Sequence, residues 1–159
     1  MNRVGFGIDV HPLVADRPLV LGGVTVPSDL GLGGHSDADV LTHAVCEALL
    51  GALALGDLGR HFLDTDPRYR GIASLRLLAE VKAMIGARGG TVVNVDATVL
   101  AQAPRLAPFL PEMAKRLADT LDLDASRVSV KAKSPEHLGL AGRREGIAAM
   151  AVASVEVPA

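Results

Sequence analysis

The sequence has few aromatic residues, one cysteine and no long apolar run, and each shortage excludes a class of protein. Aromatic residues make up only 3% of the chain, so a core must be built from the aliphatic side chains among the 49% of apolar residues. The single Cys46 cannot form an internal disulfide, and without a basic activator nearby we expect it to serve packing. The length is typical of one domain, and we expect residues 1–159 to form one.

Runs of like charge and membrane-spanning segments are also missing. The 16 basic and 18 acidic residues are scattered and sum to a net charge of −2, which argues against binding to nucleic acid. The longest apolar stretch, residues 48–55, is interrupted by Gly51 and falls short of the roughly 18 residues that a membrane span needs. No secretory signal pattern opens the chain, so we expect a soluble, cytoplasmic protein with no membrane partner.

Hydrophobic periodicity predicts strands separated by helices. Apolar residues at helical spacing predict three helices, which begin at Asp37 and near Leu77 and Met113. Alternation and β-branched residues predict strands over residues 3–10, 19–26 (two strands meeting at Gly22-Gly23), 91–100, 128–132 and 147–157. This order predicts an α/β or α+β fold, a small mixed sheet with helices on one face. The polar face of the strand over residues 91–100 requires a covering partner.

A polar and glycine-rich stretch precedes the first predicted helix. Ser36, followed three residues later by Asp39, resembles a capping box. The segment Gly33-Gly-His-Ser-Asp37 combines small residues, a histidine and an exposed helix N-terminus, which can bind phosphate through backbone N–H groups. Glycines before a helix are more often turn residues. The same alternative holds for Gly56-Asp-Leu-Gly59, which can be a simple helix stop.

Asp9, His11 and His43 are candidate metal ligands. Residues two apart in a strand project from the same face, so Asp9 and His11 lie side by side. If His43 converges on them, one oxygen and two nitrogen ligands suit zinc and leave a fourth position open, as in catalytic sites. Alternatively Asp9 merely orients His11, and His43 is an ordinary interior residue. Asp39 and Glu47 are either partners of a ligand imidazole or solvated charges.

Cations and a carboxylate gather near the C-terminus. A predicted strand delivers two lysines, Ser134 and Glu136 into a loop, and Gly142-Arg-Arg-Glu-Gly146 adds arginines. Such groups can hold a diphosphate together with magnesium, although a solvated, salt-bridged loop is the plainer interpretation. His61 and His137 receive no role of their own.

Seven motifs in order carry a resemblance to a known family. They are Gly-x-Asp-Val-His11, Gly34-His-Ser-Asp-x-Asp39 with His43, Leu55-Gly-Asp-Leu-Gly59, Phe62-x-Asp-Thr-Asp-Pro67, Ala101-Gln-Ala-Pro104, Glu136-x-Leu-Gly139 and Gly142-Arg-x-Glu-Gly146. Together they resemble the 2-C-methyl-D-erythritol 2,4-cyclodiphosphate synthases over nearly the whole chain.

The resemblance implies a lyase of the non-mevalonate isoprenoid pathway. It would convert 4-diphosphocytidyl-2-C-methyl-D-erythritol 2-phosphate into the cyclic diphosphate with release of CMP, and the substrate's own phosphate would be the nucleophile. Such phosphoryl transfer depends on positioning and charge neutralisation. The family also implies a homotrimer with active sites between subunits, whose packing would cover the free strand face.

The resemblance assigns roles to particular residues. Zinc or manganese would bind Asp9, His11 and His43, magnesium or manganese would bind Glu136, and His35 and Ser134 would be catalytic, polarising the phosphates. The other implied substrate contacts are Ser36, Asp57, Gly59, Phe62, Asp64, Asp66, Ala101, Pro104, Arg105, Leu106, Ala107, Lys133, Leu140 and Arg143. The residues from Ala101 to Ala107 would form the cytosine pocket. The chain departs from the usual family pattern at Lys133-Ser-Pro135, Leu140 and Ala107.

Two other functions compete with this interpretation. A metal-dependent phosphohydrolase of a nucleotide diphosphate would use the same open site, because a bound metal also activates water. A non-catalytic metal-binding or assembly module would use the ligands for structure alone.

Overall fold

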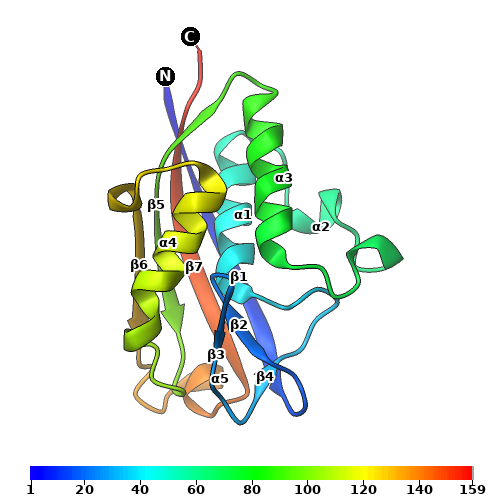
Figure 1. The fold of residues 1–159 in the computed structure, drawn as a ribbon, viewed down its shortest axis with the longest axis vertical. Helices are drawn as coiled ribbons and strands as arrows, with labels where there is room; N and C mark the ends of the chain where they lie inside the picture. The colour runs from blue at the N-terminus through cyan, green and yellow to red at the C-terminus, as the bar shows by residue number, and fades with distance from the viewer. Residues whose placement is uncertain (159) are drawn as a thin grey trace.

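A computed structural model of the chain describes residues 1–158 and contains a central sheet with helices packed against it (Figure 1). The strands are β1 (Asn2–Val14), β2 (Leu19–Leu21), β3 (Val24–Val26), β4 (Gly31–Leu32), β5 (Thr91–Leu100), β6 (Val128–Lys133) and β7 (Gly146–Glu156). The helices are α1 (Val40–Ala52), α2 (Leu58–His61), α3 (Ser74–Gly86), α4 (Leu110–Leu121) and α5 (Gly139–Gly142). Within the described residues, no helix is long and apolar enough to cross a membrane.

The main sheet has five strands in the order β4-β1-β7-β5-β6. Strands β5 and β6 pair in parallel, whereas the other pairs are antiparallel, so the sheet is mixed as the sequence predicts. The parallel pair is joined through α4, which packs against β6. A separate hairpin of β2 and β3 turns at Gly22-Gly23, where both glycines have positive φ, as the predicted turn requires.

Helix α1 lies directly on β1 because two glycines remove the side chains between them. A Cβ atom on Gly5 would stand 1.9 Å from the backbone oxygen of Ala48, and one on Gly7 would stand 2.1 Å from that of Ala44. No side chain fits in that space, so helix backbone meets strand backbone. This contact fixes the position of α1, and with it His43, relative to β1.

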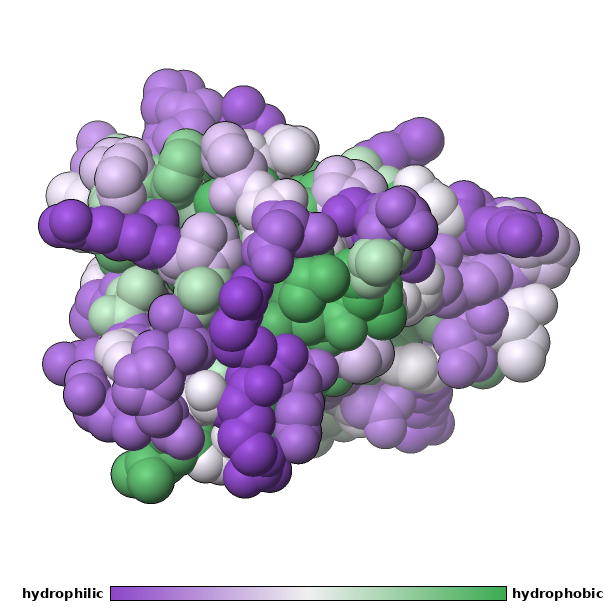
Figure 2. Space-filling model, turned by 90° about the horizontal axis from the view of Figure 1, so that it is seen from below, coloured by the Kyte–Doolittle hydropathy of each residue, from purple (hydrophilic) through white to green (hydrophobic). Residues whose placement is uncertain are grey.

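The helices bury one face of the sheet and leave the other face of β1 open (Figure 1). Side chains alternate along a strand, and the alternate residues Val4, Phe6, Ile8 and Val10 are 68%, 61%, 55% and 45% exposed. Phe6 stands opposite Val152 of β7, itself 42% exposed. Figure 2, which views the molecule from below, shows apolar patches between hydrophilic side chains. A row of bulky apolar residues in water is unusual for a monomer.

The start of α1 differs from the sequence expectation. The helix begins at Val40, and its N-cap is Asp39, whose side chain accepts a hydrogen bond from the Thr42 N–H. The predicted capping box beginning at Ser36 is therefore wrong. Asp39 is fully buried and also accepts from the N–H groups of Gly22 and Gly23, so it ties the β2–β3 turn to the helix. The N-terminus of α1 is closed by this carboxylate, and the exposed phosphate-binding helix end expected there is absent.

Candidate active site

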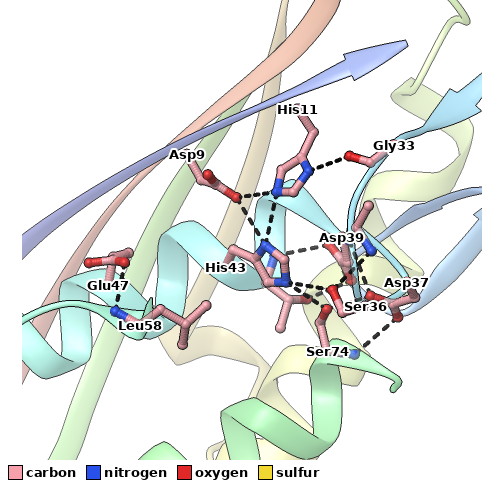
Figure 3. Close-up of polar contacts among 12 residues, drawn as sticks. Asp9, His11, Gly33, Ser36, Asp37, Asp39, His43, Glu47, Leu58 and Ser74 are labelled. Atoms are coloured by element: carbon pink, nitrogen blue, oxygen red, sulfur yellow. Dashed lines mark hydrogen bonds and ion pairs between the residues drawn. The ribbon is translucent and has the colours of Figure 1, made fainter. Parts of the chain in front are cut away.

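Three candidate ligand atoms meet between β1 and the first turn of α1 (Figure 3). The Asp9 Oδ2 atom lies 2.8 Å from His11 Nε2 and 3.0 Å from His43 Nδ1. The two imidazole nitrogens are 3.2 Å apart. Asp9 and His11 share a face of β1, as their spacing predicts, and α1 brings His43 to them. The predicted convergence is therefore confirmed.

The hydrogen bond of His11 Nδ1 determines which ring nitrogen presents a lone pair to the cluster formed by Asp9, His11 and His43. His11 Nδ1 lies 2.7 Å from the backbone oxygen of Gly33. A carbonyl oxygen only accepts hydrogen bonds, so Nδ1 carries the proton and donates it. In the neutral imidazole, Nε2 then presents its lone pair to the cluster. Such an outer contact is typical of metal-binding histidines.

Two hydroxyl groups and one carboxylate orient His43 in the same way, because Ser74 and Ser36 contact its ring and Asp37 binds Ser74. His43 Nε2 lies 2.8 Å from Ser74 Oγ and 3.3 Å from Ser36 Oγ. The Ser74 hydroxyl donates its own proton to Asp37, so it accepts from His43 Nε2–H. His43 Nδ1 consequently directs its lone pair at Asp9 and His11. Ser74 is fully buried at the start of α3, and its N–H also donates to Asp37.

The electrostatics of the cluster favour a cation at its centre. Burial raises the pKa of Asp9, but the hydrogen bonds of His11 and His43 outweigh it and hold that pKa well below its usual value. Burial lowers the pKa of His11, but the hydrogen bonds to Asp9 and Gly33 and the nearby negative charge together outweigh it, so the net pKa is raised. Two imidazole lone pairs and a carboxylate at these distances repel one another unless a proton or a metal ion lies between them. The donor set fits a divalent metal ion.

Neither acidic residue beside His43 on α1 contacts a ligand imidazole. Asp39 caps the helix, and Glu47 accepts a hydrogen bond of 2.8 Å from the Leu58 N–H at the start of α2. The expectation that one of them supports an imidazole is wrong. The alternative of a solvated charge is also wrong for Asp39, which is fully buried, whereas Glu47 keeps partial exposure to solvent. His43 is instead supported by Ser74 and Asp37, which are 37 residues apart in the chain.

A pocket of about 290 Å³ opens beside the cluster. Its wall combines the three ligands with an aromatic corner in which Phe62 and Tyr69 meet edge to face, with centroids 5.4 Å apart. The predicted site residues that line it are Asp9, His11, His35, Ser36, His43, Gly59, Phe62 and Asp64. Two more lie at its border, where Asp57 caps α2 and the Asp66 backbone oxygen accepts from His35 Nε2 at 2.9 Å.

Most of the remaining predicted residues lie at the other edge of the sheet, around the ends of β5 and β6, whereas Leu140 and Arg143 belong to the α5 segment, which packs on β7. A second pocket, of about 270 Å³, is lined there by Ala101, Pro104, Arg105, Leu106, Ala107, Lys133 and Ser134. Glu136 and Leu140 are exposed beyond it, and Arg143 pairs with Glu145 at 2.9 Å. Because β7 and β5 separate β1 from β6, one chain carries two separate groups of candidate residues.

Sequence reasoning missed Ser74 and Asp37 as partners of His43. A serine that opens an apolar helical pattern is itself a recognisable signal, and Ser74 stands at the start of α3. Its pairing with a residue 37 positions earlier carries no local signature. The buried Cys46 is confirmed as a packing residue, and His61 binds the Leu55 backbone oxygen at 2.9 Å.

The fold and the cluster together define a small mixed α/β protein with a metal-type site beside an open pocket. The YgbB family model matches residues 2–156. A 2-C-methyl-D-erythritol 2,4-cyclodiphosphate synthase of Pelotomaculum thermopropionicum is 60% identical over 96% of this chain and 94% of its own length. One from Desulforamulus reducens is 57% identical over 97% and 98%. The chain belongs to the YgbB family of 2-C-methyl-D-erythritol 2,4-cyclodiphosphate synthases, as its motifs predict.

Solved structures agree in fold. The bifunctional IspDF protein of Campylobacter jejuni superposes with a TM-score of 0.95 and 39% identity over 99% of this chain, which spans 43% of that longer protein. A 2C-methyl-D-erythritol-2,4-cyclodiphosphate synthase in a CDP-bound form superposes with a TM-score of 0.89 and 35% identity over 97% of this chain and all of its own.

Proposed function

We propose that this protein converts 4-diphosphocytidyl-2-C-methyl-D-erythritol 2-phosphate into 2-C-methyl-D-erythritol 2,4-cyclodiphosphate and CMP, in the non-mevalonate pathway. The observation that carries this conclusion is the convergence of three lone-pair donors on a pocket in a chain of this family. The substrate's 2-phosphate attacks its own β-phosphate, a new P–O bond closes the ring, and the bond to CMP breaks. Neither water nor a protein nucleophile is consumed, so the enzyme is a phosphorus–oxygen lyase.

Two metal sites support this chemistry. Asp9, His11 and His43 would hold zinc, or manganese, because two nitrogens and one oxygen suit such an ion and leave a position open to substrate. The exposed Glu136 would hold magnesium, or manganese, together with the diphosphate. When bound, the metals supply Lewis-acid neutralisation of phosphate charge.

The chain's own residues position the methylerythritol phosphate. His35 and Ser36 line the pocket beside the metal-ligating cluster, where the Ser36 O–H group can bind a phosphate oxygen and His35 can do so once its Nε2–H is released from the Asp66 oxygen. Gly59, Phe62 and Asp64 form the wall that would take the methylerythritol carbons and hydroxyls, with Asp57 and Asp66 at its border. An apolar corner beside a few polar groups is the usual lining of a small-molecule site.

The second pocket would bind the cytidine half of the substrate. The residues from Ala101 to Ala107 enclose a small hollow against Lys133 and Ser134. We assign the cytosine to this hollow and the nucleotide phosphates to Lys133, Ser134, Leu140 and Arg143 beside it. A structure of a relative with CDP supports a cytidyl ligand. In this arrangement Ser134 acts on the phosphates from the nucleotide side, and His35 acts from the metal side.

The two groups belong to one active site only if two subunits meet, so we propose a homotrimer. One chain carries the metal side on β1 and the cytidine side on β5 and β6, at opposite edges of the sheet. The open face with Val4, Phe6 and Ile8 supplies apolar area for the assembly. Packing of this face in the trimer would also cover the polar side of β5.

Complementation tests the assignment of the two halves to different subunits. His43→Ala destroys the metal side and Glu136→Ala the nucleotide side, so each variant alone should be inactive. In co-expressed mixed trimers, random pairing would give both intact halves at about a quarter of sites. Recovery of that order is expected, whereas no recovery with confirmed mixing would contradict sites shared between subunits.

Product analysis tests the reaction itself. Purified protein with Zn²⁺ and Mg²⁺ should convert the cytidyl substrate into CMP and the cyclic diphosphate, seen by ³¹P NMR. A linear phosphate product that takes up ¹⁸O from labelled water would instead establish a phosphohydrolase.

We also propose that residues 1–159 form one domain acting in the cytoplasm. The family model spanning residues 2–156 supports the former, and the unpaired Cys46 fits a reducing compartment.

A further inference from the structure

The four-residue loop Gly33–Ser36 contacts or contains every imidazole that lines the pocket. Its Gly33 oxygen accepts from His11 Nδ1 at 2.7 Å, and its Ser36 hydroxyl lies 3.3 Å from His43 Nε2. Its own His35 lines the pocket. Half of the loop is glycine, which loses more conformational freedom on ordering than any other residue. We therefore expect contacts from other segments of the chain to hold the backbone of this loop in place.

Arg17 holds this loop through two carbonyl groups. Its Nη1 atom donates to the Gly34 oxygen at 2.5 Å, and its Nη2 atom donates to the Ser36 oxygen at 2.7 Å. The two accepting groups flank His35 in the chain. A guanidinium is a planar fork that can bind two acceptors at once, which the single ammonium of lysine does not reproduce.

The backbone of Arg17 is itself firmly placed. Strand β1 pairs with β4 through Val14 and Gly31, so the turn that follows β1 packs against β4. A Cβ atom on Gly31 would stand 2.1 Å from the Arg17 backbone oxygen. The Gly33 N–H also donates to the Pro12 oxygen at 2.9 Å. The Arg17 side chain therefore extends from a fixed backbone position, and its guanidinium reaches the Gly33–Ser36 loop.

Charge pairing does not account for Arg17. Among residues 1–158, no carboxylate lies within ion-pair distance of its guanidinium, whereas Arg68, Arg116, Arg143 and Arg144 each have one. Its side chain is half-buried and spends two donors on backbone oxygens. Hydrogen bonds from a charged donor are stronger than neutral ones.

We propose that Arg17 is a positioning residue that clamps the Gly33–Ser36 loop, so that His11 keeps its ligating tautomer and His35 stays in the pocket. The proposal rests on the proposed function of the site, because it gives the loop a role in metal and phosphate binding. Both hydrogen bonds of Arg17 go to backbone oxygens of the loop rather than to a metal ligand. Its effect passes through the loop backbone.

The test compares Arg17→Ala and Arg17→Lys with wild type and with Arg88→Ala, a control at an exposed arginine after α3. The first readout is amide hydrogen exchange of residues 33–38 in metal-free protein, which requires neither metal binding nor turnover. We expect exchange there to accelerate on the order of tenfold in Arg17→Ala and less in Arg17→Lys. Arg88→Ala should match wild type.

The second readout is Zn²⁺ affinity measured by competition with a chelator. We expect about tenfold weaker binding in Arg17→Ala, within the range found for groups that orient metal ligands. Wild-type exchange rates in this segment together with wild-type Zn²⁺ affinity would overturn the clamp. If Arg17→Ala does not fold, the same two readouts on Arg17→Lys decide. Failure of the proposed function would show differently, as wild-type protein that makes no cyclic product while loop exchange still responds to Arg17.

Discussion

Replacement of Ser74 by alanine should weaken metal binding without unfolding the protein. The hydroxyl accepts a hydrogen bond of 2.8 Å from His43 Nε2–H and donates one to Asp37. Without it, the imidazole loses the partner that holds its Nδ1 lone pair toward Asp9. Loss of such an outer partner usually costs 10- to 100-fold in metal affinity, roughly 1.4 to 2.7 kcal/mol.

The structure places the expected effect at the lower end of that range. Ser36 Oγ remains 3.3 Å from His43 Nε2 and can take over part of the contact. Asp37 keeps the N–H groups of Ser74 and Asp39 as donors, so its carboxylate is not abandoned. We therefore expect about tenfold weaker Zn²⁺ binding, near 1.4 kcal/mol. The loss of unfolding free energy should be about 2 kcal/mol, the net value of the two hydrogen bonds that the hydroxyl makes.

Chelator competition measures the Zn²⁺ affinity, and circular dichroism of the metal-free protein measures the change in stability. Ser126→Ala is a matched control, because its hydroxyl donates to the exposed Asp124 far from the cluster. It should leave the affinity unchanged. A folded Ser74→Ala protein that binds Zn²⁺ within roughly twofold of wild type would refute the role assigned to this hydroxyl.

Three further predictions concern the frame of the site. Asp39→Ala removes the helix cap and leaves the N–H groups of the Gly22-Gly23 turn without an acceptor. The free energy of unfolding, measured by denaturant titration, should therefore fall by about 4 kcal/mol. A loss near zero would contradict the argument from burial. Gly7→Ala should cost roughly 3 kcal/mol and also weaken Zn²⁺ binding, because the methyl group must push α1 away from β1. The control Gly86→Ala, where a Cβ meets nothing within 4 Å, should have neither effect. Removal of metal with a chelator should abolish turnover but keep the circular dichroism spectrum, and Zn²⁺ should restore activity; unfolding on removal would favour a structural metal.

Local patterns predicted most of the fold. The alternation of residues 91–100 gives β5 with the same bounds, and the Gly22-Gly23 turn lies where the hairpin turns. Both depend on residues close in sequence, which is why a period of two or a pair of glycines suffices. The metal-ligating cluster was also predictable, because Asp9 and His11 share a strand face and His43 lies in the first turn of the first helix.

Long-range polar contacts were not predictable in the same way. The hydroxyl of Ser74 and the fork of Arg17 find their partners only after distant segments have packed together. Asp39 was misread for a related reason, since its partners at Gly22 and Gly23 lie on a hairpin 16 or 17 residues earlier. A buried, fully bonded carboxylate and a solvated one look alike in a sequence.

The contact of Gly5 and Gly7 with α1 has a consequence for how the protein can vary. Where side chains separate a helix from a strand, any exchange of those side chains changes the spacing between the two elements. Here backbone atoms alone set that spacing, at the segment that carries Asp9, His11 and His43. The aliphatic core on the other sides of α1 can therefore accumulate substitutions while the ligands keep their mutual distances. The absence of side chains at Gly5 and Gly7 therefore keeps the geometry of the ligand cluster independent of substitutions elsewhere in the core.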